Sequence, residues 1–183
     1  PDSKLLVGGQ FTFMGNQTRY ALGRLNTNGV LDTTFNATVF NPPPAPPIPS
    51  YRVQAILLQP DGQIVVGGRT TTLLLNGQTS TGGFVRRLNT NGVLDGAFNI
   101  TGSIDGPVNT LALETDGNIL VGGQFATFAG QPRTRLARVG ATGVLDPNFN
   151  VSITPSIGSG VTTLVIQPDE RILVGGFFAT VAG

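Results

Sequence analysis

The chain has 183 residues, of which only 11% are charged, and its formal net charge is +1. It contains no cysteine, histidine or tryptophan, so disulfides, thiolate or imidazole metal ligands and a histidine base for nucleophilic catalysis are excluded. No stretch is apolar over the length of a membrane-spanning helix, and the arginines are spread along the chain rather than clustered. We therefore expect neither membrane insertion nor nucleic-acid binding.

Two motifs recur along the chain at nearly constant steps. The first motif, Val-Gly-Gly, recurs at steps of 59, 55 and 53 residues, at Val7–Gly9, Val66–Gly68, Val121–Gly123 and Val174–Gly176. The second motif, Leu25–Asp32, returns at Leu88–Asp95 and in a weaker form at Val139–Asp146. A fixed period of this length indicates a repeat architecture.

The repeats divide the chain into five parts. In chain order, we predict a partial repeat 1 at 1–40, a proline-rich connector at 41–50, repeat 2 at 51–100, repeat 3 at 101–151 and a partial repeat 4 at 152–183. The six prolines in 41–49 favour a stiff, extended connector over a ligand for an aromatic groove. The corresponding segments 100–107 and 151–160 are predicted to be connectors as well.

Repeat 2 is the best preserved and predicts two hairpins. Pro60–Gly62 is a three-residue turn, since proline and glycine supply the backbone angles that such a loop needs. It places Leu58 opposite Ile64, apolar against apolar. Thr90–Gly92 forms the second turn by the same reasoning, so Leu88 faces Leu94.

The second hairpin also places an arginine opposite an aspartate. In repeat 2 these residues are Arg87 and Asp95. The same register pairs Arg24 with Asp32 and Arg138 with Asp146. Three copies of one oppositely charged pair support the register.

Each repeat therefore reads as four strands joined by two hairpins and a connector. The first strand keeps its apolar spacing in three copies, as at Val53, Ile56 and Leu58, and no helical periodicity is present. The predicted fold is all-β, with consecutive four-stranded antiparallel β-propeller-type blades and a repeat of about 53 residues. The blades form either an incomplete propeller or an open array. The strand count of three, four, four and two leads us to expect a segment of a longer polypeptide, or one completed by neighbouring chains.

The two motifs carry a resemblance to a known family. The run Pro60–Gly68, followed by Arg87–Asn99, resembles the delta-sixty repeat of bacterial β-propeller-like proteins, and the resemblance covers nearly the whole chain. It implies large secreted or surface-attached bacterial proteins with no established activity. The resemblance implies no catalytic or binding residues. Departures occur at the turns of repeats 1, 3 and 4, where one of the turn residues Pro, Asp or Gly is replaced.

Several motifs invite a site, but each has a structural interpretation. The carboxylates are assigned to turns and arginine pairs, so a two-carboxylate mechanism has little support. The Asn-Gly loops do not have EF-hand spacing, since counting Gly29 as sixth puts Phe35 twelfth. The double glycines lack the Lys-Ser/Thr of a phosphate loop and indicate close backbone approach instead. Four triplets match the glycosylation pattern and are expected to stay unmodified, at Asn16, Asn36, Asn99 and Asn150.

We therefore expect no catalytic, cofactor or metal residues. The favoured function is a non-catalytic scaffold or binding and adhesion module of an extracellular or cell-surface bacterial protein, with ligands at variable loops. Its partners are then other segments of the same or neighbouring chains and a surface glycan or protein. The alternatives are a self-assembling subunit of an extracellular fibre or sheath, a carbohydrate-binding module, and an enzyme, which the missing catalytic residue types disfavour.

Overall fold

The computed structural model describes residues 3–37, 40, 49–74 and 77–182. Most of the connector predicted at 41–50 lies outside these residues, apart from its last two positions. The described residues contain fourteen strands and no α-helix, and every strand pair is antiparallel. The all-β prediction is confirmed.

The first repeat forms a two-stranded sheet and a small hairpin. Strand β1 (Leu5–Gly8) pairs with β4 (Leu22–Leu25). Between them, β2 (Phe13–Met14) and β3 (Gln17–Thr18) pair only with each other. The sequence predicts nothing more than a connector at the position of this small hairpin.

The second repeat forms a continuous three-stranded sheet in the order β5-β6-β7. Strands β5 (Pro49–Leu58), β6 (Ile64–Leu73) and β7 (Thr79–Leu88) are each ten residues long. Strand β6 runs on past its glycine pair, through Arg69, where β1 of repeat 1 has already ended. Repeat 2 therefore has a longer hairpin than repeat 1 at this point.

The third repeat resembles the first in its small hairpin and the second in its sheet. Strands β8 (Val108–Leu113), β9 (Ile119–Gly123) and β12 (Leu136–Val139) form a sheet in the order β12-β9-β8. Between β9 and β12, β10 (Thr127–Phe128) and β11 (Gln131–Pro132) pair with each other.

The fourth repeat is a long two-stranded sheet of β13 (Ser152–Ile166) and β14 (Ile172–Ala182). The prediction of a connector at 151–160 is wrong, because β13 already begins at Ser152. The N-terminal part of β13 has a partner, since Ser152 lies opposite Ala182 and Ile153 opposite Val181.

In repeats 1, 2 and 3 the last predicted strand is reduced to one isolated bridge. These bridges join Leu25 to Leu31, Leu88 to Leu94 and Val139 to Leu145. In repeat 2, the backbone amide of Asp95 also donates a hydrogen bond of 2.9 Å to the carbonyl oxygen of Arg87. The pairing register predicted for the second hairpin is confirmed, although the paired segment is much shorter than a full strand.

The first hairpin of repeat 2 also has the predicted geometry. The amide of Gln59 donates to the carbonyl of Gln63 at 2.8 Å, and Leu58 lies opposite Ile64. Gly62 closes the turn with φ of +84°, a value that residues with a Cβ atom rarely adopt. The turn residues therefore set the register of the strands on both sides.

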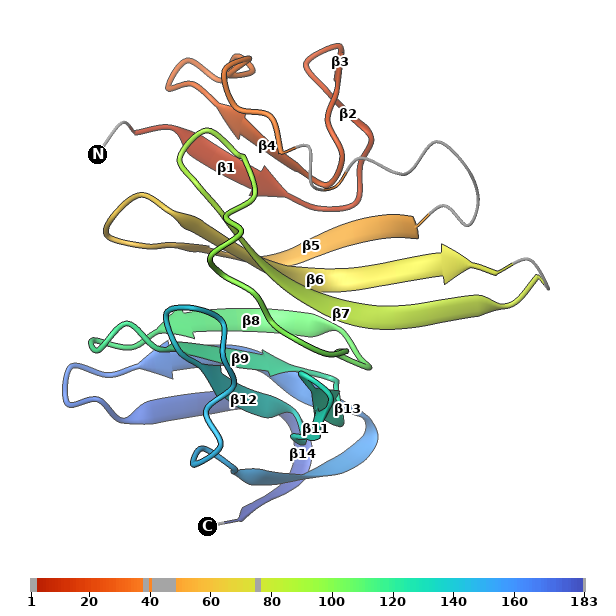
Figure 1. The fold of residues 1–183 in the computed structure, drawn as a ribbon, viewed down its shortest axis with the longest axis vertical. Helices are drawn as coiled ribbons and strands as arrows, with labels where there is room; N and C mark the ends of the chain where they lie inside the picture. Colours follow the sequence, from red (N-terminus) through yellow and green to blue (C-terminus); the bar gives the residue numbers. More distant parts are fainter. Residues whose placement is uncertain (1–2, 38–39, 41–48, 75–76, 183) are drawn as a thin grey trace.

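Figure 1 shows the sheets stacked one after another along the long axis, with the two termini at opposite ends. The core is divided among three clusters, each between consecutive repeats. One cluster includes Phe35 of repeat 1 and Phe84 of repeat 2, and another includes Val65 of repeat 2 and Phe128 of repeat 3. The third cluster includes Leu120 of repeat 3 and Val161 of repeat 4. Each sheet thus buries its apolar residues against its neighbours, as in other repeat proteins.

The two ends of this stack leave apolar side chains exposed. Phe13 is 68% exposed in repeat 1, and Leu173 and Phe177 are 51% and 69% exposed in repeat 4. Val65, the equivalent of Leu173 in repeat 2, is fully buried. No helix that is long and apolar enough to span a membrane occurs in the described part of the chain.

Candidate functional site

Three repeats carry a β-bulge at the same position of their first strand. In β5 the pairing with β6 shifts between Val53 and Ala55, so Gln54 is the extra residue. Asn109 in β8 and Thr162 in β13 are the extra residues of the corresponding shifts. A bulge twists a strand and redirects a side chain, and bulges are common beside functional sites.

The three bulged residues line one open hollow of about 730 Å³, which we call the polar hollow. Its other polar side chains are Gln10, Arg52 and Gln124. No carboxylate lines it, so Arg52 is its one charged group among the described residues. The volume lies within the range of small-molecule sites, about 300–1,000 Å³. The lining combines amides, a hydroxyl and a guanidinium, which are groups that hydrogen-bond polar ligands.

Hydrogen bonds join the bulged residues across the repeats. The Nε2 atom of Gln54 donates to Oδ1 of Asn109 at 3.1 Å, and Nδ2 of Asn109 donates to the backbone carbonyl of Val161 at 3.0 Å. The hydroxyl of Thr162 donates to the carbonyl of Gly175 at 3.2 Å. A row of polar side chains therefore runs through repeats 2, 3 and 4 along their first strands.

Glycines allow the strands beside the polar hollow to approach closely. A Cβ atom on Gly68 would collide with the carbonyl oxygen of Arg52, and one on Gly123 would collide with that of Pro107. These are the second glycines of their pairs, and both contacts lie next to a bulge. The close backbone approach predicted for the double glycines is confirmed at these positions.

The arginine–aspartate pairs of the second hairpins are present in all three repeats. The separations are 2.8 Å from Nε of Arg24 to Oδ2 of Asp32, and 2.7 Å both from Arg87 to Asp95 and from Arg138 to Asp146. Each guanidinium also lies over the ring of the phenylalanine that follows its aspartate, at Phe35, Phe98 and Phe149.

These contacts shift the pKa values of the carboxyl groups. The pKa of Asp32 lies far below its ordinary value, chiefly because the Lys4 ammonium and the Thr34 hydroxyl donate hydrogen bonds to it. The pKa of Asp95 is lowered mainly by the backbone amide of Ala97, and that of Asp146 mainly by Arg138. Beside the third pair, burial raises the pKa of Glu114. The nearby charge of Arg138 lowers this pKa, but it offsets the effect of burial only in part.

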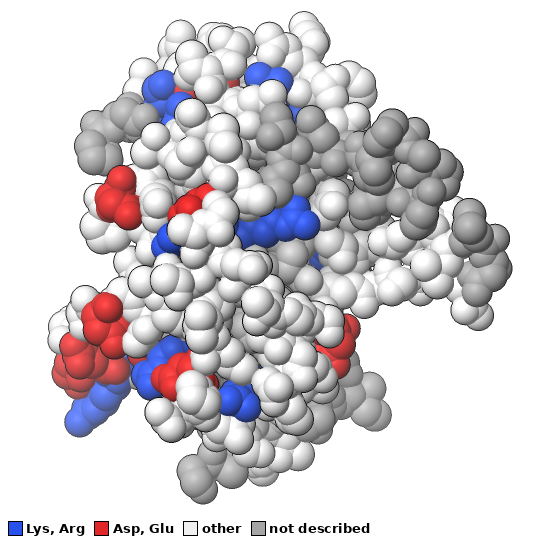
Figure 2. Space-filling view, in the orientation of Figure 1, with Lys and Arg blue, Asp and Glu red and all other residues white. Residues whose placement is uncertain are grey.

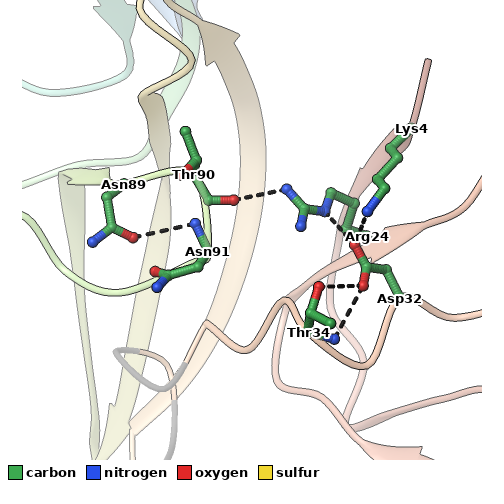
Figure 3. Close-up of polar contacts among 7 residues, drawn as sticks. All are labelled: Lys4, Arg24, Asp32, Thr34, Asn89, Thr90 and Asn91. Carbon is green, nitrogen blue, oxygen red and sulfur yellow. Dashed lines mark hydrogen bonds and ion pairs between the residues drawn. The ribbon is translucent and has the colours of Figure 1, made fainter. Parts of the chain in front are cut away.

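The arginines of the first two pairs also contact the next repeat. Figure 3 shows Arg24 between Asp32 of its own repeat and the second turn of repeat 2, where its Nη1 atom donates to the carbonyl of Thr90 at 2.7 Å. Arg87 makes the same contact to the carbonyl of Ala141 in repeat 3, also at 2.7 Å. Two of the three pairs predicted from cross-strand register therefore link neighbouring repeats as well.

The backbone strengthens this inter-repeat contact. The amide of Asn36 donates to the carbonyl of Asn91 at 3.2 Å, and that of Asn99 donates to Thr142 at 2.9 Å. The asparagines of two glycosylation-type triplets thus lie where the turn of the next repeat packs. Beside them, a Cβ atom on Gly92 would lie 3.0 Å from the carbonyl carbon of Asn36.

The Asn-Gly turns use their side-chain oxygens within the turn. The Oδ1 atom of Asn28 accepts the amide of Val30 at 3.0 Å, and that of Asn91 accepts the amide of Val93 at 3.2 Å. Among the described residues, no three acidic side chains lie close enough together to hold a metal ion. On the face shown in Figure 2, charged side chains occur in small separate groups, and neither sign forms one large patch.

Sequence reasoning did not identify the polar hollow, although the sequence contains a signal for it. The spacing of three from Val53 to Ile56 is incompatible with one face of a regular strand, which has a period of two. Both residues nevertheless pack in the cluster between repeats 1 and 2, because the extra residue at Gln54 brings Val53 and Ile56 to the same face of the sheet. The same spacing recurs in repeats 3 and 4.

The stacked antiparallel sheets, each built from one sequence repeat, define a β-propeller-type repeat protein. A family model described as a beta-propeller domain of unknown function (DUF5122) matches residues 1–35, 59–98 and 114–149. These segments make up more than half of the chain, and the chain belongs to this family. No curated protein and no solved structure matches it.

Proposed function

We propose that the chain is a non-catalytic binding module that holds a hydroxyl-rich ligand, such as a surface glycan, in the polar hollow. One observation carries the proposal: three successive repeats each direct a bulged polar side chain, Gln54, Asn109 and Thr162, to one hollow. Amide and hydroxyl groups donate and accept hydrogen bonds, so they match the hydroxyls of a sugar. The row is built from the stacked blades rather than from variable loops.

The engagement of the carboxylates supports a non-catalytic role. Asp32, Asp95 and Asp146 are held in ion pairs, and Asp105 accepts the amides of Ala126 and Thr127. The aspartates of the first hairpins accept amides within their own turns, at Asp61, Asp116 and Asp169. Carboxylates that the fold engages in this way are poor candidates for proton transfer, which needs a free and suitably tuned acid or base.

The setting that we propose is a secreted or cell-surface bacterial protein, in which this module acts as a scaffold or adhesion domain. The resemblance of Pro60–Gly68 and Arg87–Asn99 to the delta-sixty repeat supports that setting. The absence of cysteine and the low content of charged residues are compatible with it. In such a protein the ligand is a glycan or protein on the opposing surface.

A glycan array with the purified chain tests the binding function. We expect selective binding of one glycan class, which Asn109→Ala and Gln54→Ala weaken while circular dichroism shows an unchanged strand content. Gln131→Ala is the matched control, because it removes an exposed amide in β11, away from the bulged strands. An array without selective binding, or binding that only the control variant weakens, would contradict the proposal.

A second function is favoured by the exposed face of the last sheet, namely self-assembly as a subunit of an extracellular fibre or sheath. Val165 and Leu173 lie opposite each other on β13 and β14, and both are 51% exposed. Phe177 and Val181 continue this apolar face along β14, at 69% and 49% exposed. An apolar sheet face of this kind promotes association with other chains or segments.

Sedimentation velocity over a range of protein concentrations tests this second function. We expect concentration-dependent association that Phe177→Ser reduces. Val144→Ser is the control, since Val144 is 66% exposed in a turn of repeat 3 and does not belong to this face. A monomer at all concentrations, or equal effects of both substitutions, would contradict self-assembly through this sheet.

A further inference from the structure

Two arginines lie directly opposite each other in the sheet of repeat 2, and one of them, Arg52, lines the polar hollow. Arg52 of β5 faces Arg69 of β6 in the strand register. Paired residues of an antiparallel sheet lie on the same face, about 4.5–5.5 Å apart at Cβ. No hydrogen bond, ion pair or ring contact reaches either side chain from the described residues, whereas the other nine basic side chains are all engaged.

This pair is specific to repeat 2. Aligned on the Val-Gly-Gly motifs, Arg69 occupies the position of Gln10 in repeat 1 and Gln124 in repeat 3. Both of these glutamines line the polar hollow. Arg52, which also lines it, corresponds to Pro107 in repeat 3. Repeat 2 therefore places two cations where the other repeats place neutral residues.

The arrangement is unfavourable for the fold by itself. Like charges directly opposite each other in a sheet are destabilising. The acidic residues do not relieve this repulsion, since no carboxylate lines the polar hollow and none pairs with either arginine in the described part of the chain. An anion bound between the two guanidinium groups would neutralise the repulsion.

We propose that Arg52 and Arg69 bind the carboxylate of an acidic sugar whose hydroxyl groups are held by the amides of the polar hollow. This inference rests on the proposed function and specifies its ligand class as uronic-acid oligosaccharides. A guanidinium binds a carboxylate through two parallel hydrogen bonds, which gives both affinity and orientation. Asn109 and Gln54, on the neighbouring first strands, then face the hydroxyl side of the sugar.

Isothermal titration of the whole chain with trigalacturonic acid tests the inference. The uncharged counterpart, galactotriose, and inorganic phosphate are titrated in parallel at low ionic strength. We expect trigalacturonic acid to bind tightest, and Arg52→Gln or Arg69→Gln to weaken it about tenfold, the factor for loss of one hydrogen bond between charged groups. Arg171→Gln is the matched control, because Arg171 is an exposed arginine of the last hairpin and pairs with Asp169. The Arg171→Gln variant should bind trigalacturonic acid with the same affinity as the unmodified chain.

The outcomes separate this inference from the proposed function. Binding of galactotriose that Asn109→Ala removes but Arg52→Gln leaves unchanged would keep the binding module and overturn the acidic ligand. Equal affinity for phosphate and trigalacturonic acid would reduce the pair to a simple anion site and would also overturn it. No binding of trigalacturonic acid, with unchanged circular dichroism of the protein, overturns the inference directly.

Discussion

Val108 of the third repeat packs directly over Gly67 of the second: a Cβ atom on Gly67 would lie 2.6 Å from Cγ1 of Val108. The same contact joins Gly8 to Val53, and Gly122 to Val161, at the same distance. In the first three Val-Gly-Gly motifs, the first glycine is thus the position against which the next blade packs. The repeated motif therefore describes the interface between repeats as well as the interior of each repeat.

Gly67→Ala should destabilise the chain by about 1–3 kcal/mol, the usual range for an added methyl in a packed core. Val108 and Leu111 both lie against this position, so the added methyl has no free space. Chemical denaturation measures the change. Gly96→Ala is the control, because no atom lies within 4 Å of its Cβ position. Equal effects at the two positions would contradict the packing of the blades through Gly67.

The hairpins could be predicted from the sequence because their cause is local. The turn residues of Pro60–Gly62 and Thr90–Gly92 specify backbone angles within three residues, and the register of the adjoining strands follows from them. The Arg87–Asp95 pair was a consequence of that register and needed no knowledge of other repeats. In the structure its two charged groups are 2.7 Å apart.

The polar hollow could not be predicted in the same way, because its residues belong to different repeats. A bulge is visible in the sequence only as a break in the alternation, and the spacing of Val53 and Ile56 by itself predicts only an apolar strand. The contact from Arg24 to Thr90 spans 66 residues. No local rule states which carbonyl a guanidinium reaches in the next blade.

Gly92→Ala should be more destabilising than Gly29→Ala. Both glycines have positive φ, +93° and +80°, so an alanine is strained at either position. Only Gly92 packs against another repeat, with Asn36 at 3.0 Å, while nothing lies within 4 Å of Gly29. The difference between the two free energies of unfolding therefore isolates the inter-repeat contact, beyond a shared strain of about 1 kcal/mol. Equal values would show that the turn of repeat 2 does not press on repeat 1.

Reversing both charges of Arg87 and Asp95 should be milder than reversing either charge alone. A single reversal brings like charges together in a site where the side chains are only 10% and 16% exposed. A double-mutant cycle should give a coupling of about 0.5–3 kcal/mol. The double variant does not recover full stability, because Arg87 also donates to Ala141. Additive single effects would argue against the ion pair.

Stability should fall as the pH drops below about 4. The pKa values of Asp32, Asp95 and Asp146 are lowered in the folded chain from an ordinary 3.8, so the unfolded state binds more protons in this range. Their contribution is complete above that value and is lost as the pH falls toward the folded values. Burial raises the pKa of Glu114, which acts in the opposite direction. Urea unfolding between pH 2 and 6 measures this dependence, and the free energy of unfolding should fall less at acid pH in Asp32→Asn than in the unmodified chain. The same dependence of the free energy of unfolding on pH in both proteins would contradict the assignment to Asp32.

Arg69→Gln should stabilise the ligand-free chain at low ionic strength. It removes the repulsion with Arg52, and cross-strand charge pairs of this kind contribute about 0.2–1 kcal/mol. The gain should shrink when 0.5 M sodium chloride is added, because the screening length, about 10 Å at 0.1 M salt, becomes shorter and the repulsion between exposed charges weakens. Arg171→Gln, which instead breaks a pair with Asp169, should give no gain at either ionic strength. Denaturation curves at both salt concentrations measure the difference. A loss of stability in Arg69→Gln would mean that the guanidinium already has a compensating partner in the fold, and the case for a bound carboxylate between the two arginines would lose its energetic basis.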